Sequence, residues 1–375
     1  MADDSGASLE TAIDDDPDDP AAYSVYGDWL QRRGELRGEL IALSLAAEAQ
    51  HAADPRKKPP AQLALGKLLK KHAAALLGPL ARLVADPADP TAPPLIWRHG
   101  FIARGELTEA PERPAAPFVG ELLRHPSGRF LRELIVKTEG EGPAVIDLLE
   151  ASAPRSLREL ELHALVDLGD LSALWAPLAR LERLSLTGRG FELGELRLPQ
   201  LRRARLAAAE LSGSCVRAVA RAALPHLERL ELRFGGRGAD LATFEDLRPL
   251  LQRTDLPALT HLKLRRAPYA GSIVRELVGA PLARQLVVLD LSHGSLNPAD
   301  IEVLVQHKDR FAQLRELWLP LSRLRDQDRR RAMEMAKNVI SDARGPQDRL
   351  DDEVHEYELR TRASGPRRAP PPGRP

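Results

Sequence analysis

A six-residue pattern of leucine and polar positions recurs along the middle of the chain. In the pattern Leu-x-x-Leu-x-Leu, with one substitution tolerated, the last four positions alternate polar and apolar. It starts at Leu131, Leu157, Leu181, Leu201, Leu227, Leu259, Leu286 and Leu314, and successive starts lie 20 to 32 residues apart. Alternation with a period of two is typical of a strand with one buried face. The spacing therefore predicts eight strands in one repeating array.

The segments between these strands have the spacing of helices. In the fourth unit, apolar residues recur at steps of three and four after Ser212 or Ser214, either of which can serve as N-cap. In the seventh unit, Asn297 and Pro298 mark the start of a helix. No single unit buries its apolar face alone, so neighbouring units must stack. The pattern predicts an α/β fold, a curved parallel sheet with helices on its convex side.

The repeat resembles that of the leucine-rich-repeat family over residues 131–320. The resemblance implies a solenoid with an open, concave sheet. The family usually has Asn or Cys three residues after the last Leu, where the side chain bonds to the turn backbone. Those positions are occupied here by Glu139, Leu165, Arg189, Ala209, Gly235, Ala267, Gly294 and Ser322. The turns must therefore be satisfied by other hydrogen bonds, and a regular curvature is not implied.

A helical module precedes the repeats. Asp19 and Pro20 indicate an N-cap and a first helical residue, Gly34 ends that helix, a second helix carries residues 40–45, and a third is expected over residues 61–77. Residues 22–43 closely resemble the repeat-companion domain, a short bacterial module found before leucine-rich repeats. The matching residues are Tyr26, Asp28, Trp29, Leu30, Gly34, Arg37, Gly38 and Glu39, whereas Gly27 stands where the family usually has Ala. The resemblance implies architecture and not activity.

Two interpretations of the charged residues in this module stay open. Asp28, Arg37 and Glu39 either form ion pairs or caps that set the angle between two helices, or they form a ligand site. A deep pocket with paired acid and base groups near Asp28 would favour an enzymatic role. Trp29 is expected in the core between the helices.

These patterns divide the chain into six parts. They are an acidic flexible N-terminus (1–18), the helical module (19–80), a linker and N-terminal cap with a strand pair (81–125), the repeat array (126–324), a C-terminal capping helix (325–345) and a mostly disordered basic, Pro-rich tail (346–375). The strand pair is placed within residues 95–107. The capping helix is expected to carry Val339 and Ile340 on its apolar face. A membrane-surface role for this helix is the less favoured alternative because the apolar face is small.

Composition excludes several classes of protein. The chain has 54 basic and 54 acidic residues, so no global charge points to nucleic acid or membrane. The N-terminus lacks the features of a secretory signal, and no stretch approaches the ~20 apolar residues of a membrane helix. With one cysteine, Cys215, no intrachain disulfide can form, which fits a reducing compartment. We expect a soluble, cytoplasmic protein.

Signatures of enzymatic chemistry are missing from the sequence. It contains no phosphate-binding loop and no His-Glu-x-x-His, and one cysteine cannot build a thiolate zinc site. Cys215 is placed at a helix start, where a thiol pKa can fall, but a lone cysteine among Val and Ala is more often buried. We therefore expect no enzymatic activity, no cofactor and no metal.

The alternation places every second strand residue on the open face of the sheet. Three arginines, Arg183, Arg203 and Arg229, then follow one another on adjacent strands, where like charges repel. The sequence predicts a docking patch for an acidic surface, with Trp318 and Ile135 as apolar anchors near the ends. The patch comprises Arg183, Arg203, Arg205, Arg229, Arg233, Lys263, Arg265 and Trp318. The bland alternative is a solvated charged face in an Arg-rich protein.

The leading functional hypothesis is a non-enzymatic scaffold or adaptor that binds a protein with an acidic surface. Repeat arrays of this kind present an extended surface without an enclosed pocket. The alternative is binding of nucleic acid or another polyanion through the arginine patch and the Arg-rich tail, which should depend steeply on salt. The oligomeric state is not indicated by the sequence.

Overall fold

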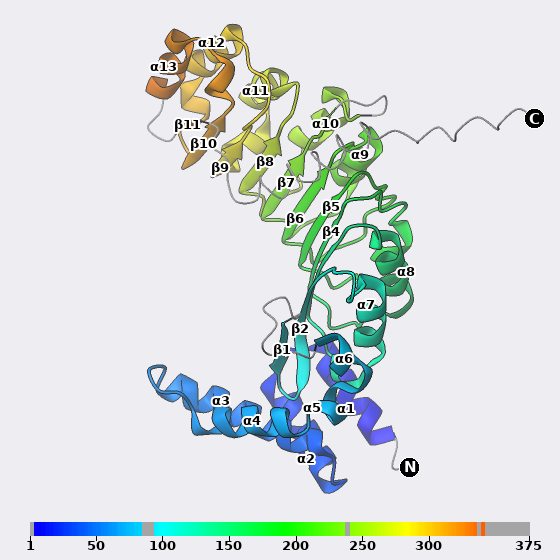
Figure 1. Cartoon of the computed structure of the whole chain (residues 1–375). Helices are drawn as coiled ribbons and strands as arrows, with labels where there is room; N and C mark the ends of the chain where they lie inside the picture. Colours follow the sequence, from blue (N-terminus) through cyan, green and yellow to red (C-terminus); the bar gives the residue numbers. More distant parts are fainter. Residues whose placement is uncertain (1–3, 85–93, 237–240, 336–338, 342–375) are drawn as a thin grey trace, which may run out of the picture.

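The computed structural model describes residues 4–84, 94–236, 241–335 and 339–341, and these form a curved α/β solenoid (Figure 1). One 11-stranded sheet follows the chain order from β1 to β11. The strands are β1 (Leu95–Arg98), β2 (Phe101–Thr108), β3 (Glu133–Thr138), β4 (Glu159–Ala164), β5 (Arg183–Gly188), β6 (Arg203–Ala208), β7 (Arg229–Arg233), β8 (His261–Arg265), β9 (Val288–Asp290), β10 (Glu316–Leu319) and β11 (Val339–Ser341). All neighbouring strands are parallel except β1 and β2.

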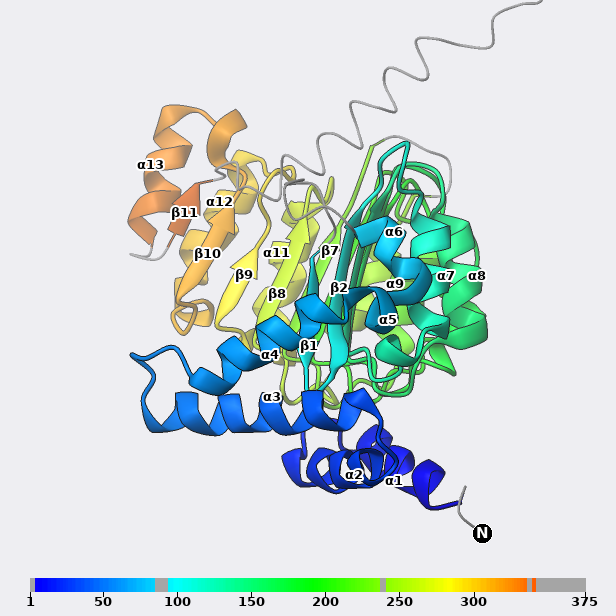
Figure 2. The same ribbon diagram turned by 60° about the horizontal axis from the view of Figure 1, so that its bottom comes forward.

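Helices cover the convex side of the sheet, and a helical module closes one end (Figures 1 and 2). The module consists of α1 (Asp4–Asp15), α2 (Pro20–Arg32), α3 (Leu36–Ala53), α4 (Pro60–Lys71), α5 (Ala73–Leu77) and α6 (Ala81–Val84). The convex layer contains α7 (Ala115–Arg124), α8 (Gly142–Ser152), α9 (Gly213–Arg221), α10 (Phe244–Leu251), α11 (Ala270–Gly279), α12 (Pro298–Gln306) and α13 (Asp326–Met335). None of the helices in the described ranges combines the length and apolar composition needed to cross a bilayer.

The eight strands predicted from the leucine pattern are β3 to β10, and each one lies at its predicted position. The leucines of neighbouring repeats are in register, so that Leu160 stands opposite Leu184 and Leu162 opposite Leu186. All four side chains are buried. Ser212 caps α9 by accepting a hydrogen bond from the Cys215 amide, and Asn297 caps α12. The repeat thus places one continuous apolar core between the sheet and the convex layer.

The leucine pattern missed a strand at each end of the array. In β2, Gly105 occupies the place of a leucine and pairs with Leu134 of β3. A Cβ atom at Gly105 would lie 2.8 Å from Leu122, so α7 fills the space that a leucine fills elsewhere. At the other end, Val339 and Ile340 form strand β11, and the prediction that they belong to a helix is wrong. Parallel pairing with β10 extends the sheet here.

Main-chain hydrogen bonds between consecutive turns replace the missing asparagine ladder. The Leu165 amide donates to the Glu139 carbonyl at 3.2 Å. The Arg189 amide donates to the Val166 carbonyl, and the Glu210 amide to the Arg189 carbonyl, both at 2.9 Å. The turns that follow β3, β4, β5 and β6 are therefore joined by their own main-chain groups, without a buried side-chain amide.

Two consecutive repeats in the middle of the array have no α-helix on the convex side. Between α8 and α9, the described chain contains one short 3-10 helix, η3 (Ser172–Trp175). Trp175 is 1% exposed, and its Nε1 donates to the Leu193 carbonyl of the following repeat at 2.6 Å. Large side chains and extended backbone thus fill the space that a helix occupies in the other repeats.

The prediction of a flexible N-terminus over residues 1–18 is wrong for the described residues. Residues 4–15 form α1, whose Ile13 is fully buried against the module. The carboxylate of Asp15 pairs with Arg180 at 2.8 Å, and that of Asp18 pairs with Arg98 at 3.1 Å. One apolar anchor and these ion pairs hold the segment on the array. The predicted tail (346–375) and residues 342–345 of the predicted capping helix lie outside the described residues.

The strand pair predicted within residues 95–107 is β1 and β2, and the module packs on it through aromatic side chains. The rings of Phe101 and Phe130 lie 4.7 Å apart, and Tyr23 meets Phe130 edge-on at 5.9 Å. Trp29 is half-buried and stacks on Tyr26 at 5.8 Å. The single helix predicted over residues 61–77 is divided at His72 into α4 and α5.

The interpretation of Asp28, Arg37 and Glu39 as one ion-pair set is wrong. Asp28 and Glu39 are exposed, and neither carboxylate has an ion pair or hydrogen bond within the described part of the chain. Arg37 instead donates to the Gly100 carbonyl at 2.7 Å and to Ser127 Oγ at 2.9 Å. It therefore joins the module to the cap of the sheet. Among the described residues, no acid or base group pairs with Asp28.

Candidate interaction face of the sheet

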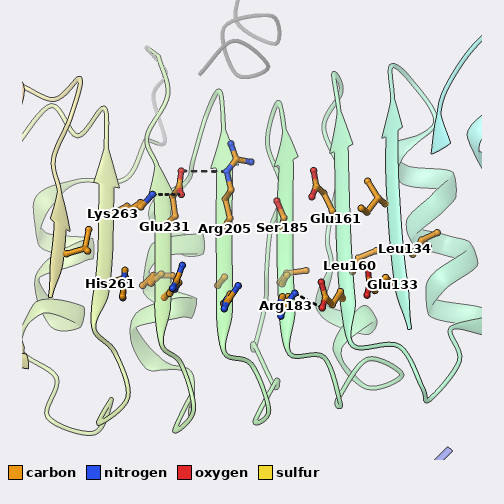
Figure 3. Close-up of a pocket in the computed structure, with 18 of the residues that line it drawn as sticks. Glu133, Leu134, Leu160, Glu161, Arg183, Ser185, Arg205, Glu231, His261 and Lys263 are labelled. Atoms are coloured by element: carbon orange, nitrogen blue, oxygen red, sulfur yellow. Dashed lines mark ion pairs between the residues drawn. The ribbon is translucent and has the colours of Figure 1, made fainter. Parts of the chain in front are cut away.

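The open face of β3 to β10 forms a shallow groove of about 680 Å³ (Figure 3). Two rows of side chains lie on this face of the sheet, because successive strand residues alternate between the core and the open side. Row three contains Glu133, Glu159, Arg183, Arg203, Arg229, His261, Val288 and Glu316, and row five contains Ile135, Glu161, Ser185, Arg205, Glu231, Lys263, Asp290 and Trp318. The leucine pattern predicted this arrangement, and the observed register confirms it.

The three arginines of row three are neighbours on adjacent strands but are not electrostatically equivalent. Arg183 forms an ion pair with Glu159 at 2.7 Å. Arg203 and Arg229 stand opposite each other and are both exposed. Neither has an ion-pair or hydrogen-bond partner among the residues that the structure describes. Two adjacent guanidinium groups at the centre of the groove are therefore available to an incoming anion.

Carboxylates limit this cationic centre on both sides. Glu133 in row three and Glu161 in row five lie toward the N-terminal end of the sheet (Figure 3). Glu159 stands next to Glu133 in row three. Toward the other end, Glu316 is exposed on β10, where it accepts a hydrogen bond from the Trp318 indole. The groove therefore has the charge order negative, positive, negative along the solenoid axis.

In row five, the positive charges of Arg205 and Lys263 are largely neutralised by ion pairs with Glu231. The carboxylate of Glu231 lies 3.6 Å from Arg205 and 3.9 Å from Lys263, both measured between charged atoms. Arg205 also donates to Thr187 Oγ1 at 2.9 Å. These two cations are held within the protein and contribute less to the open patch than the sequence predicted.

Arg233 and Arg265 lie in register at the predicted position of the sheet, but they are not exposed there as the predicted patch requires. They are only 7% and 8% exposed. Arg265 extends along the sheet toward Asp290, at 3.6 Å, and donates to Ser292 Oγ at 3.2 Å. Their strands end at these positions, and neighbouring positions of the same row, such as Thr187, are also buried. Two arginines of the predicted patch are therefore part of the buried framework.

The predicted apolar anchors lie apart from the arginine centre. Ile135 is half-buried on β3 and lines the groove, and Trp318 is half-buried on β10. The ion pair between Arg183 and Glu159 was not predicted from the sequence. The signal was present, because these residues occupy the same position of consecutive repeats.

His163, on β4, has an unusual protonation equilibrium. Burial, together with Arg205 and Lys137, lowers the pKa of its imidazole to about 4. In the unfolded chain this histidine has an ordinary pKa of about 6.5. Between about pH 4 and about pH 6.5 the unfolded chain therefore binds a proton at His163, while the folded protein does not. The contribution of neutral His163 to the free energy of unfolding is therefore fully present above about pH 6.5. It is lost as the pH falls from there toward 4.

We expect the free energy of unfolding to fall by about 2 kcal/mol between pH 6.5 and pH 4.5 because of this residue alone. Urea titrations of the wild type and of His163→Gln at both pH values measure it. The variant should lose correspondingly less stability over this interval. Equal losses in both proteins would contradict the assignment.

Neither a metal-binding cluster nor an exposed thiol is found among the described residues. Within the described ranges, no three His, Cys, Asp or Glu side chains are placed to hold a metal ion. Cys215 is buried in α9, and burial raises the pKa of its thiol to about 12. Its Sγ donates to the Phe191 carbonyl at 2.9 Å. The arrangement suits recognition by charge and shape.

Neither a protein-family model nor a curated protein matches this chain. Among solved structures, it is similar to a Bacteroides fragilis protein whose crystal structure was determined by a structural genomics consortium. The two are 18% identical, the match covers 75% of this chain and 82% of that chain, and the TM-score is 0.49. A likeness of this size says nothing of what either protein binds.

Proposed function

We propose that this chain is a leucine-rich-repeat scaffold with a repeat-companion-like module, and that it binds an acidic segment of a partner protein on the open face of its sheet. Arg203 and Arg229 are the residues that would receive the acidic groups. The proposal makes the protein a non-enzymatic binding module. It is supported by the repeat and by the open groove with its exposed arginines.

The observation that carries the proposal is the pair of unpartnered arginines in the middle of the groove. Their mutual repulsion costs about 0.2–1 kcal/mol, since like charges directly opposite each other on neighbouring strands are destabilising. A carboxylate from a partner would remove this cost and would gain charge-assisted hydrogen bonds.

The flanking carboxylates favour a protein segment over a nucleic acid. A nucleic acid is uniformly negative and would meet Glu161 on one side of the arginines and Glu316 on the other. A protein segment can place acidic side chains at the centre and basic ones at the flanks. Charge complementarity of this kind sets partner choice as well as the association rate.

Binding of a fluorescein-labelled peptide with four consecutive glutamates between two lysines tests the proposal. Fluorescence anisotropy should show that Arg203→Glu/Arg229→Glu weakens binding at least about tenfold relative to the wild type. The matched control is Arg221→Glu/Arg284→Glu, which reverses two exposed arginines away from the groove. An oligonucleotide of equal length serves as competitor.

Unfolding by heat separates a binding role from a structural one. The doubly reversed variant should be as stable as the wild type or more stable, because Arg203→Glu places a carboxylate beside Arg183. A clear loss of stability would show that the arginines support the fold. Tighter binding of the oligonucleotide than of the peptide, with a steep salt dependence, would favour the polyanion function.

A further inference from the structure

The groove itself specifies the charge order of its ligand. The charged groups of the groove that have no ion pair among the described residues are, in order along the sheet, Glu161 on β4, Arg203 on β6, Arg229 on β7 and Glu316 on β10. An extended ligand that crosses the strands must therefore carry a basic group, then acidic groups, then a basic group.

This charge order occurs in the chain itself, beyond the last strand. Residues 349–360 read Arg-Leu-Asp-Asp-Glu-Val-His-Glu-Tyr-Glu-Leu-Arg, with five acidic residues between Arg349 and Arg360. We propose that this segment, residues 349–360, occupies the groove of its own chain until an acidic partner segment displaces it. The inference rests on the proposed function, because both ligands would use Arg203 and Arg229.

The position of the last described strand allows the segment to reach the arginines. Strand β11 ends at Ser341 and lies four strands from β7 and five from β6. At ~4.8 Å per strand these steps amount to about 19 and 24 Å. Ser341 pairs with Leu319 of β10, which lies three residues after the row-three residue Glu316. This offset adds about 10 Å along the strand direction.

The length of chain is sufficient for this distance. The combined displacement from Ser341 to Arg203 is about 26 Å. Asp351 lies ten residue steps after Ser341 in the sequence, and ten steps span at most about 35 Å. A chain that approaches from β11 brings Arg349 to the side of Glu316 and carries Arg360 toward Glu161. The direction of the chain thus agrees with the charge order of the groove.

Tethering makes such a contact effective even when each ion pair is weak. A segment on a short linker has an effective concentration in the millimolar range. A segment with a dissociation constant of about 0.1 mM would then occupy the groove about nine-tenths of the time, and a free acidic ligand would bind about tenfold more weakly. The segment would set a threshold that only a multivalent or better-matched partner exceeds.

Cross-linking in the full chain tests the cis contact directly. The test pair combines Val354→Cys with Ser185→Cys, which lies in the groove. The control pair combines Val354→Cys with Arg221→Cys, which is exposed on the convex helix α9. The native Cys215 is buried and does not compete for a short bis-maleimide. The Ser185 pair should form the intramolecular cross-link, and this should weaken in 1 M salt, where the screening length is about 3 Å. Equal cross-linking of both pairs would overturn the inference.

Peptide binding provides the second readout. The tail variant carries the three substitutions Asp351→Asn, Asp352→Asn and Glu353→Gln. It should bind the lysine-flanked glutamate peptide about tenfold more tightly than the wild type does. The control Asp147→Asn/Glu245→Gln/Asp309→Asn makes the same change in net charge on the convex side and should stay within about twofold of the wild type.

The two proposals fail in different ways. If the wild type and the tail variant bind the peptide equally well, the inference is wrong and the proposed function stands. If the tail variant does not bind the peptide at all, the proposed function fails. The cross-link reports the cis contact in either case.

Discussion

Replacing Trp175 with alanine should lower the free energy of unfolding by about 4 kcal/mol. Trp175 is fully buried, and its Nε1 holds the Leu193 carbonyl of the next repeat. Because no α-helix covers these two repeats, this side chain supplies packing that a helix supplies elsewhere in the described array. The substitution would leave a cavity and an unsatisfied buried carbonyl. Urea denaturation followed by far-ultraviolet circular dichroism measures the loss.

Two further variants separate the contributions. Trp175→Phe keeps most of the ring volume but removes the donor to Leu193, so it should cost about 1–3 kcal/mol. Trp318→Ala removes a half-buried tryptophan from β10 and should cost clearly less than Trp175→Ala. If the urea midpoint of unfolding of Trp175→Ala equals that of the wild type, the two repeats without an α-helix do not depend on this side chain.

Replacing Arg37 with alanine should cost about 3 kcal/mol and should release the N-terminal module from the sheet. Its guanidinium bonds to Gly100 and Ser127 and lies 4.6 Å above the Phe101 ring. Ser127 in turn donates to the Leu76 carbonyl at 2.6 Å, so one side chain connects three segments. Arg37→Lys should recover part of the loss, because an ammonium group cannot reproduce the planar, forked contact.

Limited proteolysis together with tryptophan fluorescence detects the release of the module. Cleavage within α2 and α3 should become faster in Arg37→Ala while the repeat array stays protected. Arg56→Ala, which alters an exposed loop arginine, serves as the control and should change stability by less than about 0.5 kcal/mol. Unchanged proteolysis in Arg37→Ala would show that the aromatic cluster alone holds the module.

Side-chain contacts leave only part of the predicted patch available to a partner. Of the eight residues predicted to bind a partner, Arg203 and Arg229 are the two that are exposed and unpartnered among the described residues. Arg183, Arg205 and Lys263 pair with glutamates, and Arg265 is buried beside Asp290. The periodicity placed these residues in the correct rows, but a row does not show how far a flexible guanidinium extends along it.

The sequence by itself determined the repeat. Evenly spaced leucines at Leu-x-x-Leu-x-Leu fix strand positions because apolar side chains must leave water, and a period of two assigns every residue between them to one side of the sheet. For this reason, all eight predicted strands and the two charged rows agree with the structure.

Only the tertiary structure decided where this local rule stops. Strand β2 has Gly105 in a leucine position because α7 fills the space, and Val339 and Ile340 become a strand because β10 offers a free edge. Arg37 joins the helical module to the cap of the sheet because the fold brings Gly100 and Ser127, which are distant in the sequence, next to it. Hydrophobic periodicity records which side of an element is buried, whereas pairing and filling of space depend on partners that are remote in the chain.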